Sequence, residues 1–211
     1  YSILFPDEVD ALVCVSGAAR ALPFAIALRS VQREAVRSDP DWKGGHYEPP
    51  GPLTGLRLAR KLGLITYRSA LEWRQRFGRE RVGASEGGAG PFGIEFEIES
   101  YLEANARKFV GTFDANCYLY LSRSMDLFDA AEHGGSVEAG LGRIQARDVL
   151  VIGVEADFLF PLDQQEEIAT VLKRAGRNVR FAALPSIQGH DSLLVDIDRF
   201  SPVIAEFLGQ I

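Results

Sequence analysis

The chain has 211 residues, of which 46% are hydrophobic and 25% are charged, and its formal net charge at pH 7 is −6. A chain of this length and composition can bury a sizeable core, which excludes an intrinsically disordered protein. The acidic balance argues against nucleic acid or an anionic membrane surface as the main partner. We find no apolar stretch near ~18 residues and no signal peptide, and therefore expect a cytoplasmic protein.

In chain order, the first predicted elements are a short helical segment and a strand. Residues 1–5 resemble the end of a helix already in progress, and residues 11–16 (ALVCVS) form an apolar run typical of a buried strand. Two further runs of this kind follow much later, at 149–154 (VLVIGV) and 179–184 (VRFAAL). Because each run is nearly all apolar, we expect a parallel sheet that is covered on both faces.

A long interruption separates the first strand from the second. Helical spacing recurs within it, at 18–37, 55–64, 98–109 and 118–128. The glycine-rich stretch 83–93 lacks the Lys-Ser/Thr of a phosphate-binding loop, so we expect an ordinary loop there. A helical insertion between parallel strands predicts a lid over their carboxyl ends, where ligands bind in open α/β sheets.

We therefore expect three segments. Residues 1–17 hold the end of a helix and a core strand, residues 18–146 are a mostly helical lid, and residues 147–211 are the C-terminal α/β core. Amphipathic helices are predicted in this core at 161–175 and 199–208. Their alternation with the strands predicts right-handed crossovers.

Asp157 and His190 are the candidate catalytic residues. Asp157 follows the second strand and His190 follows the third, so both side chains are expected at one edge of the sheet. An acid followed by a base is the order that ends the triad of α/β serine hydrolases, in which the carboxylate orients the histidine. The alternatives are an Asx-turn or helix cap for Asp157 and an ordinary surface loop for His190. No G-x-S-x-G-like elbow occurs in the chain.

The cysteines and the other histidines show no metal-ligand spacing. Cys14 lies in the first apolar run, where a reduced, buried thiol is expected, and Cys117 stands alone. His46 and His133 lie in polar, glycine-containing stretches and are expected to be solvated. We therefore predict no metal site.

Five long segments resemble one enzyme family. They are SGAARALPFAIALRSVQREAVRSDPDW, GLRLARKLGLITYRSALEW followed by RFGRE, FEIESYLEANARKFVGTFDANCYLYLSRSMDLFD, ADFLFPLDQQ and QGHDSLL. They resemble the homoserine O-acetyltransferase family, within it the serine and homoserine O-succinyltransferase branch, and the resemblance covers essentially the whole chain. The resemblance implies the C-terminal portion of an α/β-hydrolase fold, with a mostly parallel sheet and a helical lid inserted between strands. It also implies a homodimer through lid helices and a ping-pong transfer from acyl-CoA, either acetyl-CoA or succinyl-CoA, with no bound cofactor.

The resemblance assigns Asp157 as the triad acid and His190 as the base. It places the nucleophilic serine in an elbow upstream of Tyr1, so that residues 1–5 would end the nucleophile helix. Neither Ser2 nor Ser16 matches that elbow. The chain alone is then expected to be inactive.

Four further residues are candidates for binding the implied acceptor, L-serine or L-homoserine. The α-carboxylate of an amino acid calls for a guanidinium, and its ammonium calls for a carboxylate. Arg60 in GLRLAR matches an arginine that the family keeps near the pocket, and Tyr67 in ITYRS follows on the same stretch. Arg20 and Asp191 complete the set. The structural alternatives are an ion pair within the lid for Arg60, a bridge between helices for Arg20, and orientation of the loop for Asp191.

The expected function is O-acyl transfer to an amino-acid hydroxyl in cysteine or methionine biosynthesis. One alternative is an esterase that uses the same residues with water as acceptor. Another is a non-catalytic fragment, whose first strand would present an open edge. The sequence leaves the acyl donor open. It also leaves the acceptor open, because serine and homoserine differ by one methylene, a discrimination of only ~1–3 kcal/mol.

Overall fold

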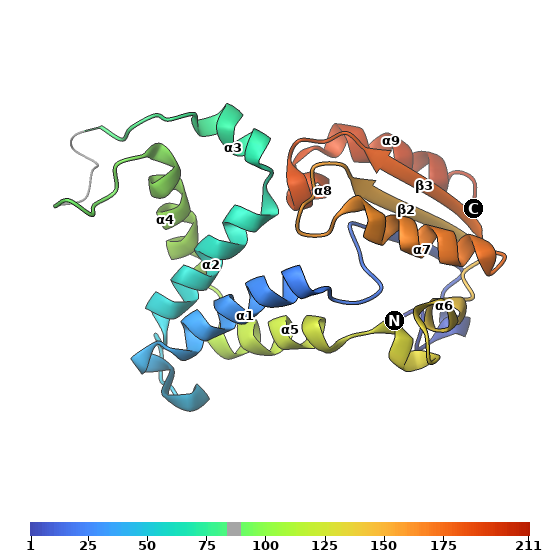
Figure 1. The fold of residues 1–211 in the computed structure, drawn as a ribbon, viewed down its shortest axis with the longest axis horizontal. Coiled ribbons are helices and arrows are strands. Elements are labelled where there is room, and N and C mark those ends of the chain that lie inside the picture. Colours follow the sequence, from blue (N-terminus) through green and yellow to red (C-terminus); the bar gives the residue numbers. More distant parts are fainter. Residues whose placement is uncertain (84–89) are drawn as a thin grey trace. The chain divides into compact units, whose positions relative to one another are not determined.

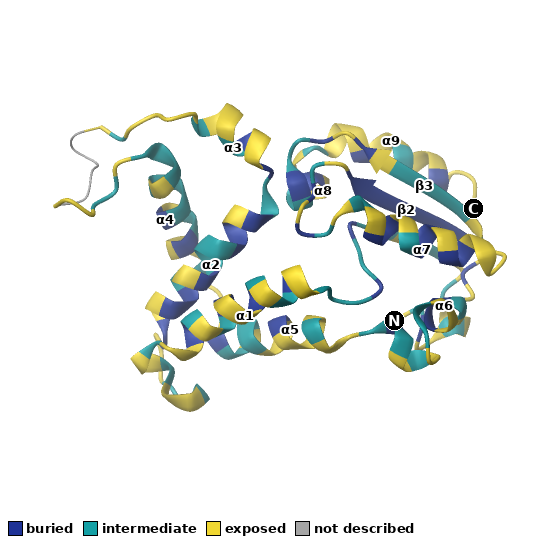
Figure 2. Cartoon of the chain, viewed as in Figure 1, coloured by how far each residue is buried: buried dark blue, intermediate teal, exposed yellow. Residues whose placement is uncertain are grey.

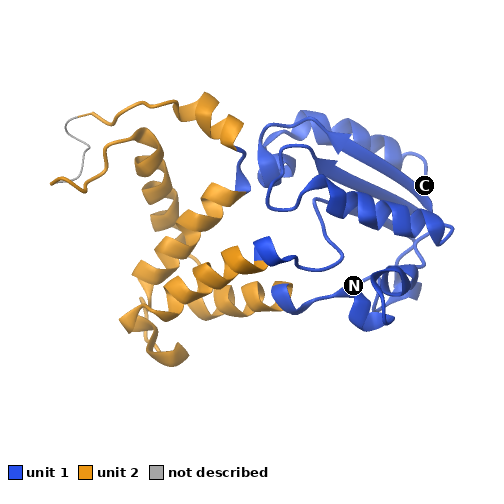
Figure 3. Cartoon of the chain, viewed as in Figure 1, with its two compact units in different colours: residues 1–25, 67–69, 126–211 blue, residues 26–66, 70–125 orange. Residues whose placement is uncertain are grey.

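The computed structural model describes residues 1–83 and 90–211. The predicted loop at 83–93 therefore lies largely outside the described residues. The chain forms two compact units (Figure 3). We call residues 1–25, 67–69 and 126–211 the sheet unit, and residues 26–66 and 70–125 the helical unit.

These units divide the chain differently from the three predicted segments. Residues 18–25 and 126–146, which we expected in the lid, cluster with the sheet. So does the short stretch 67–69, which is flanked in sequence by residues of the helical unit on both sides. Ser69 of this stretch contacts the loop that carries His190.

The sheet has three parallel strands in the order β1-β2-β3 (Figure 1). They are β1 (Ala11–Val15), β2 (Asp148–Val154) and β3 (Asn178–Leu184), and all three were predicted from their apolar runs. Every residue of the central strand β2 is buried (Figure 2), as expected for a strand covered on both faces. The predicted parallel sheet is confirmed.

Helices cover both faces of this sheet. Because side chains alternate along a strand, neighbouring residues of β2 join different clusters. Val149 packs in a cluster with α7 (Leu162–Arg174), and Leu150 packs in another with α9 (Ile197–Leu208). The two helices predicted in the C-terminal core are thus confirmed.

The rest of the sheet unit consists of short elements. Residues 1–5 form one turn, closed by hydrogen bonds from the amides of Leu4 and Phe5 to the carbonyl of Tyr1. The predicted helix end is therefore only a turn, and Pro6, which has no N–H, begins a 3-10 helix instead. The other short elements are η1 (Pro6–Glu8), η3 (Ala130–His133), α6 (Val137–Gly142), η4 (Gly189–Asp191) and α8 (Ser192–Val195).

The helical unit confirms the four helical stretches predicted in the insertion. Gly55 allows two of its helices to pack closely, since a Cβ there would lie 2.3 Å from the carbonyl oxygen of Ala35. Among the described residues, no helix is long and apolar enough to cross a lipid bilayer. The elements that lie wholly or mostly in this unit are α1 (Pro23–Arg37), η2 (Pro40–Gly45), α2 (Leu53–Tyr67), α3 (Ala70–Phe77), α4 (Glu97–Val110) and α5 (Ala115–Leu127).

A buried carboxylate joins α2 to α4. Glu103 is 8% exposed and accepts hydrogen bonds from Arg57 Nη1 (2.5 Å) and Arg107 Nε (2.6 Å). Lys61 forms a further ion pair with it. The Lys61 ammonium, followed by the two guanidinium groups, lowers the pKa of Glu103 to about 2.

Candidate active site

Asp157 lies in the turn that follows β2, and its side chain is buried. Its Oδ1 accepts hydrogen bonds from the amides of Leu159 (3.0 Å) and Phe160 (2.9 Å). Its Oδ2 lies 2.8 Å from Nδ1 of His190. The Asx-turn contacts and the predicted pairing with His190 therefore coexist, with one carboxylate oxygen making each.

His190 lies in η4, in the loop after β3. A carboxylate can only accept, so in a neutral imidazole paired this way Nδ1 donates to Asp157 and Nε2 carries the lone pair. The imidazole stacks on Phe160, with ring centroids 5.0 Å apart, and its side chain is 27% exposed. The structure thus brings the predicted acid and base together and leaves one imidazole nitrogen available for proton transfer.

The backbone beside His190 is held by a close approach to residues 67–69. Gly189 has a φ of +75°, and a Cβ there would lie 2.8 Å from the amide nitrogen of Ser69. Only glycine fits this position without strain. Tyr67, predicted as a substrate residue, has its ring 6.1 Å from the imidazole between centroids. Tyr67 therefore lies beside His190.

Sequence reasoning missed several of these neighbours. Phe160, Arg68 and Ser69 all contact the His190 loop or its imidazole, and none was a candidate. Arg68 and Ser69 do lie inside the ITYRS stretch that we singled out for Tyr67. Phe160 lies three positions after Asp157 in ADFLFP. The presence of an aromatic residue so near the predicted acid was the only sequence feature that pointed to Phe160.

The two predicted arginines, Arg20 and Arg60, have partners within the protein. Arg20 forms an ion pair with Glu167 of α7 at 3.3 Å, which fits the alternative of bridging elements. Arg60 belongs to the helical unit, where its guanidinium lies 4.6 Å from the ring centroid of Phe109. Asp191 lies directly after His190 in η4 and forms a long ion pair with Arg68. The substrate roles of these residues stay predictions.

Ser16, just after the first strand, has an unusual environment. It directly follows β1 and has a φ of +46°, a strained value for a residue other than glycine. It is 7% exposed, and its Oγ has no hydrogen-bond partner among the residues that the structure describes. The contacts of His190 in the described part of the chain include Asp157, Phe160 and Tyr67.

Neither thiol is activated. Both cysteines are free. Burial raises the pKa of the Cys14 thiol, and a hydrogen bond to Asp114 raises the pKa of Cys117. In the described ranges 1–83 and 90–211, no cluster of three His, Cys, Asp or Glu side chains could hold a metal ion.

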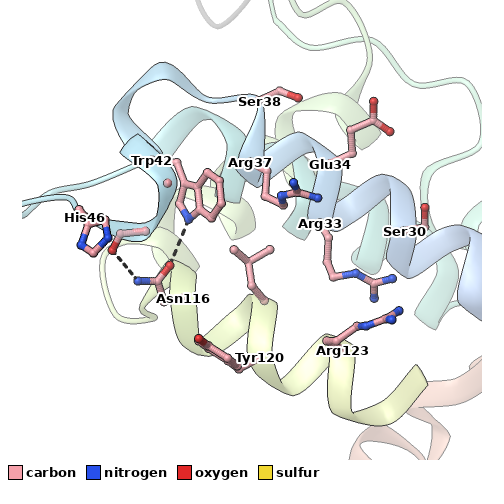
Figure 4. Close-up of a pocket in the computed structure, with 13 residues that line it drawn as sticks. Ser30, Arg33, Glu34, Arg37, Ser38, Trp42, His46, Asn116, Tyr120 and Arg123 are labelled. Carbon is pink, nitrogen blue, oxygen red and sulfur yellow. Dashed lines mark hydrogen bonds between the residues drawn. The ribbon is translucent and has the colours of Figure 1, made fainter. Parts of the chain in front are cut away.

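A separate cleft of about 920 Å³ lies in the helical unit, among α1, η2 and α5 (Figure 4). Arg33, Arg37 and Arg123 line it, and the Arg37 guanidinium lies over the ring of Trp42 at 5.7 Å. Asn116 Oδ1 accepts a hydrogen bond from Trp42 Nε1 at 3.1 Å, which fixes the indole against α5. The wall of this cleft therefore carries positive charge, although the chain as a whole is acidic. None of the described residues that line the cleft is a predicted site residue.

Comparison with solved structures identifies the class of fold, which is that of the α/β hydrolases. The chain is similar to a homoserine O-acetyltransferase from Bacillus anthracis, with a TM-score of 0.86 and 24% identity over 98% of this chain and 55% of that one. It is also similar to esterase E22, with a TM-score of 0.85, 23% identity, and coverage of 98% and 56%. A third structure, the α/β hydrolase MGS-M2, has a TM-score of 0.63 with 16% identity, covering 100% of this chain and 60% of that one. The predicted α/β-hydrolase fold is thus confirmed.

The proteins that are most informative by sequence are serine O-succinyltransferases. The chain is 57% identical over 210 residues to a serine O-succinyltransferase of Litchfieldella anticariensis, and 55% identical over 211 residues to one of Xylella fastidiosa. Each match covers 99% of this chain and 57% of the relative, so the chain spans little more than half the length of these relatives. No protein-family model matches the chain. The predicted resemblance to serine O-succinyltransferases is confirmed.

Proposed function

We propose that the protein containing this chain is an acyl-CoA-dependent O-acyltransferase acting on the hydroxyl of L-serine or L-homoserine. The observation that carries the proposal is the contact of 2.8 Å between His190 Nδ1 and Asp157 Oδ2, in the loops after two adjacent parallel strands. The names of the sequence relatives favour a succinyl donor and a serine acceptor. The name of one structural relative, a homoserine O-acetyltransferase, gives the related pair of an acetyl group and homoserine.

In the first half-reaction, a serine hydroxyl attacks the thioester carbonyl of acyl-CoA. Nε2 of His190 accepts the hydroxyl proton, while Asp157 holds the imidazole and stabilises the imidazolium that forms. The carbon–sulfur bond then breaks, and CoA leaves as the thiol with the proton from His190. We propose that the nucleophile lies in a segment upstream of Tyr1, since the relatives are longer than this chain.

In the second half-reaction, the hydroxyl of the amino acid attacks the acyl-enzyme ester. His190 accepts that proton as base and returns it to the departing serine oxygen, which restores the free enzyme. The product is the O-acyl amino acid. Backbone N–H groups would stabilise the oxyanion in both steps.

The remaining predicted residues take substrate roles in this proposal. Arg60 and Arg20 are candidates for the carboxylate of the acceptor or the acyl group, and Asp191 is the candidate for the ammonium. Tyr67, beside the imidazole, would contact the acceptor. The three-segment division, with residues 18–146 as a lid that limits hydrolysis, belongs to the same proposal.

The resemblance supports three further features of the whole protein. We propose a homodimer formed through helices of the insertion, a cytoplasmic location in keeping with amino-acid biosynthesis, and no bound cofactor beyond the acyl-CoA co-substrate. Sedimentation of the full-length protein tests the dimer. A monomer at micromolar concentration would contradict it.

An esterase is the second candidate, because the fold is shared with esterase E22. Product analysis separates the two functions in the full-length protein. An acyltransferase forms O-succinylserine from succinyl-CoA only when L-serine is present, whereas an esterase releases succinate at the same rate with and without the amino acid. No turnover of succinyl-CoA or acetyl-CoA under either condition would contradict both and favour a non-catalytic role.

A further inference from the structure

The loop that carries His190 is attached to the short stretch 67–69 at three points. Ser69 Oγ donates a hydrogen bond to the carbonyl oxygen of Ile187. The backbones also touch, since a Cβ on Gly189 would lie 2.8 Å from Ser69 N. The third attachment is the side chain of Arg68. All these residues belong to the sheet unit, although 67–69 is joined in sequence to α2 and α3.

The guanidinium of Arg68 spans the turn that contains the base. Its Nη1 donates to Gln188 Oε1 at 2.7 Å, and its Nε lies 3.7 Å from Asp191 Oδ2. These two partners flank Gly189 and His190, one on each side. The Arg68 side chain is only 13% exposed, so this contact is largely shielded from water.

A planar guanidinium suits this task better than an ammonium does. Its N–H groups point in fixed directions, so one arginine can hold two acceptors at a set separation. Lysine presents a compact point charge on a flexible stem and lacks that geometry. Arg68 thus reaches both sides of the Gly189–His190 pair, with a hydrogen bond to Gln188 before it and an ion pair with Asp191 after it.

We propose that Arg68 is a positioning residue, which holds the turn 188–191 so that the His190 imidazole stays in contact with Asp157 and the Asp191 carboxylate keeps its orientation. Arg68 acts through these residues and touches no reacting atom. Small displacements of a catalytic group are costly, since about 1 Å can lower a rate about 100-fold. The kinetic part of this inference rests on the proposed function, whereas the structural part does not.

The first test needs no substrate. In the full-length protein labelled with ¹⁵N-histidine, the proton that His190 Nδ1 donates to Asp157 gives a low-field NMR signal. We expect Arg68→Ala to broaden or abolish that signal and Arg68→Lys to fail to restore it. Arg74→Ala, which removes an exposed arginine of the neighbouring helix α3, is the matched control and should keep the signal. An unchanged signal in Arg68→Ala overturns the proposal.

The second test measures release of CoA thiol from succinyl-CoA in a single turnover. We expect Arg68→Ala to lower the rate about 10- to 100-fold per folded molecule. Added guanidinium ion at millimolar concentration should recover part of the loss. A change confined to the melting temperature, with the wild-type rate per folded molecule, would make Arg68 merely structural and overturn the proposal.

Two outcomes keep the inference separate from the proposed function. If the wild-type protein transfers no acyl group, the proposed function fails, and the NMR signal alone decides on Arg68. If Arg68→Ala does not fold, Arg68→Lys carries both tests. A wild-type signal and rate in Arg68→Lys then overturn the proposal.

Discussion

Two buried carboxylates, one in each unit, have different partners. Asp157 of the sheet unit is 3% exposed, and its oxygens are shared between two backbone amides and one imidazole. Glu103 of the helical unit is 8% exposed and is surrounded by Arg57, Lys61 and Arg107. The two acids are similarly buried, so burial alone does not distinguish their roles.

The type of partner makes the difference. Arginine and lysine keep their protons at neutral pH, so the cluster around Glu103 can only hold α2 against α4. Histidine gains and loses a proton in this range, so the carboxylate of Asp157 orients a group that can take part in chemistry. The comparison therefore predicts that changes around Asp157 alter rates, whereas changes around Glu103 alter stability.

The largest effect is expected for His190→Ala in the full-length protein. Without a base, the rate of acyl transfer should fall about 1,000- to 10,000-fold. Steady-state assays with succinyl-CoA and L-serine measure it. His46→Ala, which removes a histidine of the helical unit remote in sequence from the acid and base, is the control. A rate near wild type for His190→Ala would remove His190 from the mechanism.

Asp157→Asn should have the next largest effect. The amide can donate to Nδ1 and so favours the wrong tautomer, with an expected loss of about 100- to 10,000-fold in the acylation rate. Rapid-mixing assays of CoA thiol release measure this loss. Asp163→Asn, in the first turn of α7, should leave the rate unchanged. Equal rates for the two variants would mean that Asp157 only builds its turn.

Glu103→Gln should change stability rather than rate. The substitution leaves Arg57 and Lys61 partly buried without their carboxylate, which should lower the free energy of unfolding by about 2–3 kcal/mol. Urea unfolding measures the change, with Glu166→Gln on the exposed face of α7 as control. A loss of activity in folded Glu103→Gln would show that the cluster supports catalysis.

The smallest effect is a pH dependence of this stability difference. The pKa of Glu103 is lowered from 4.5 to about 2, so its stabilisation is complete above the unfolded value and is lost as the pH falls toward about 2. The gap in unfolding free energy between wild type and Glu103→Gln should therefore shrink from neutral pH to about pH 3. A gap that stays constant over this range would contradict the lowered pKa.

The sequence was sufficient to predict the pairing of Asp157 with His190. Both follow apolar strand runs, and parallel strands end at one edge of a sheet, so local patterns determine the contact. The strands, and the helices at 161–175 and 199–208, carry clear periodicity for the same reason.

The supporting contacts could not be predicted in this way. Arg68 reaches Gln188 across 120 positions of sequence, and no periodicity encodes such a contact. In the Glu103 cluster, the i,i+4 pair with Arg107 was accessible to sequence reasoning, but the approach of Arg57 depends on how two helices pack. The compact units likewise depend on tertiary contacts, which is why residues 126–146 cluster with the sheet.

The most direct test of the contrast between the two acids is a single-turnover measurement of CoA thiol release from succinyl-CoA, made side by side on folded Asp157→Asn and Glu103→Gln. We predict that Asp157→Asn is slower than wild type by at least about 100-fold and that Glu103→Gln reacts at the wild-type rate. Equal rates in the two variants, or a slower Glu103→Gln, would contradict the assignment of Asp157 to chemistry and Glu103 to stability.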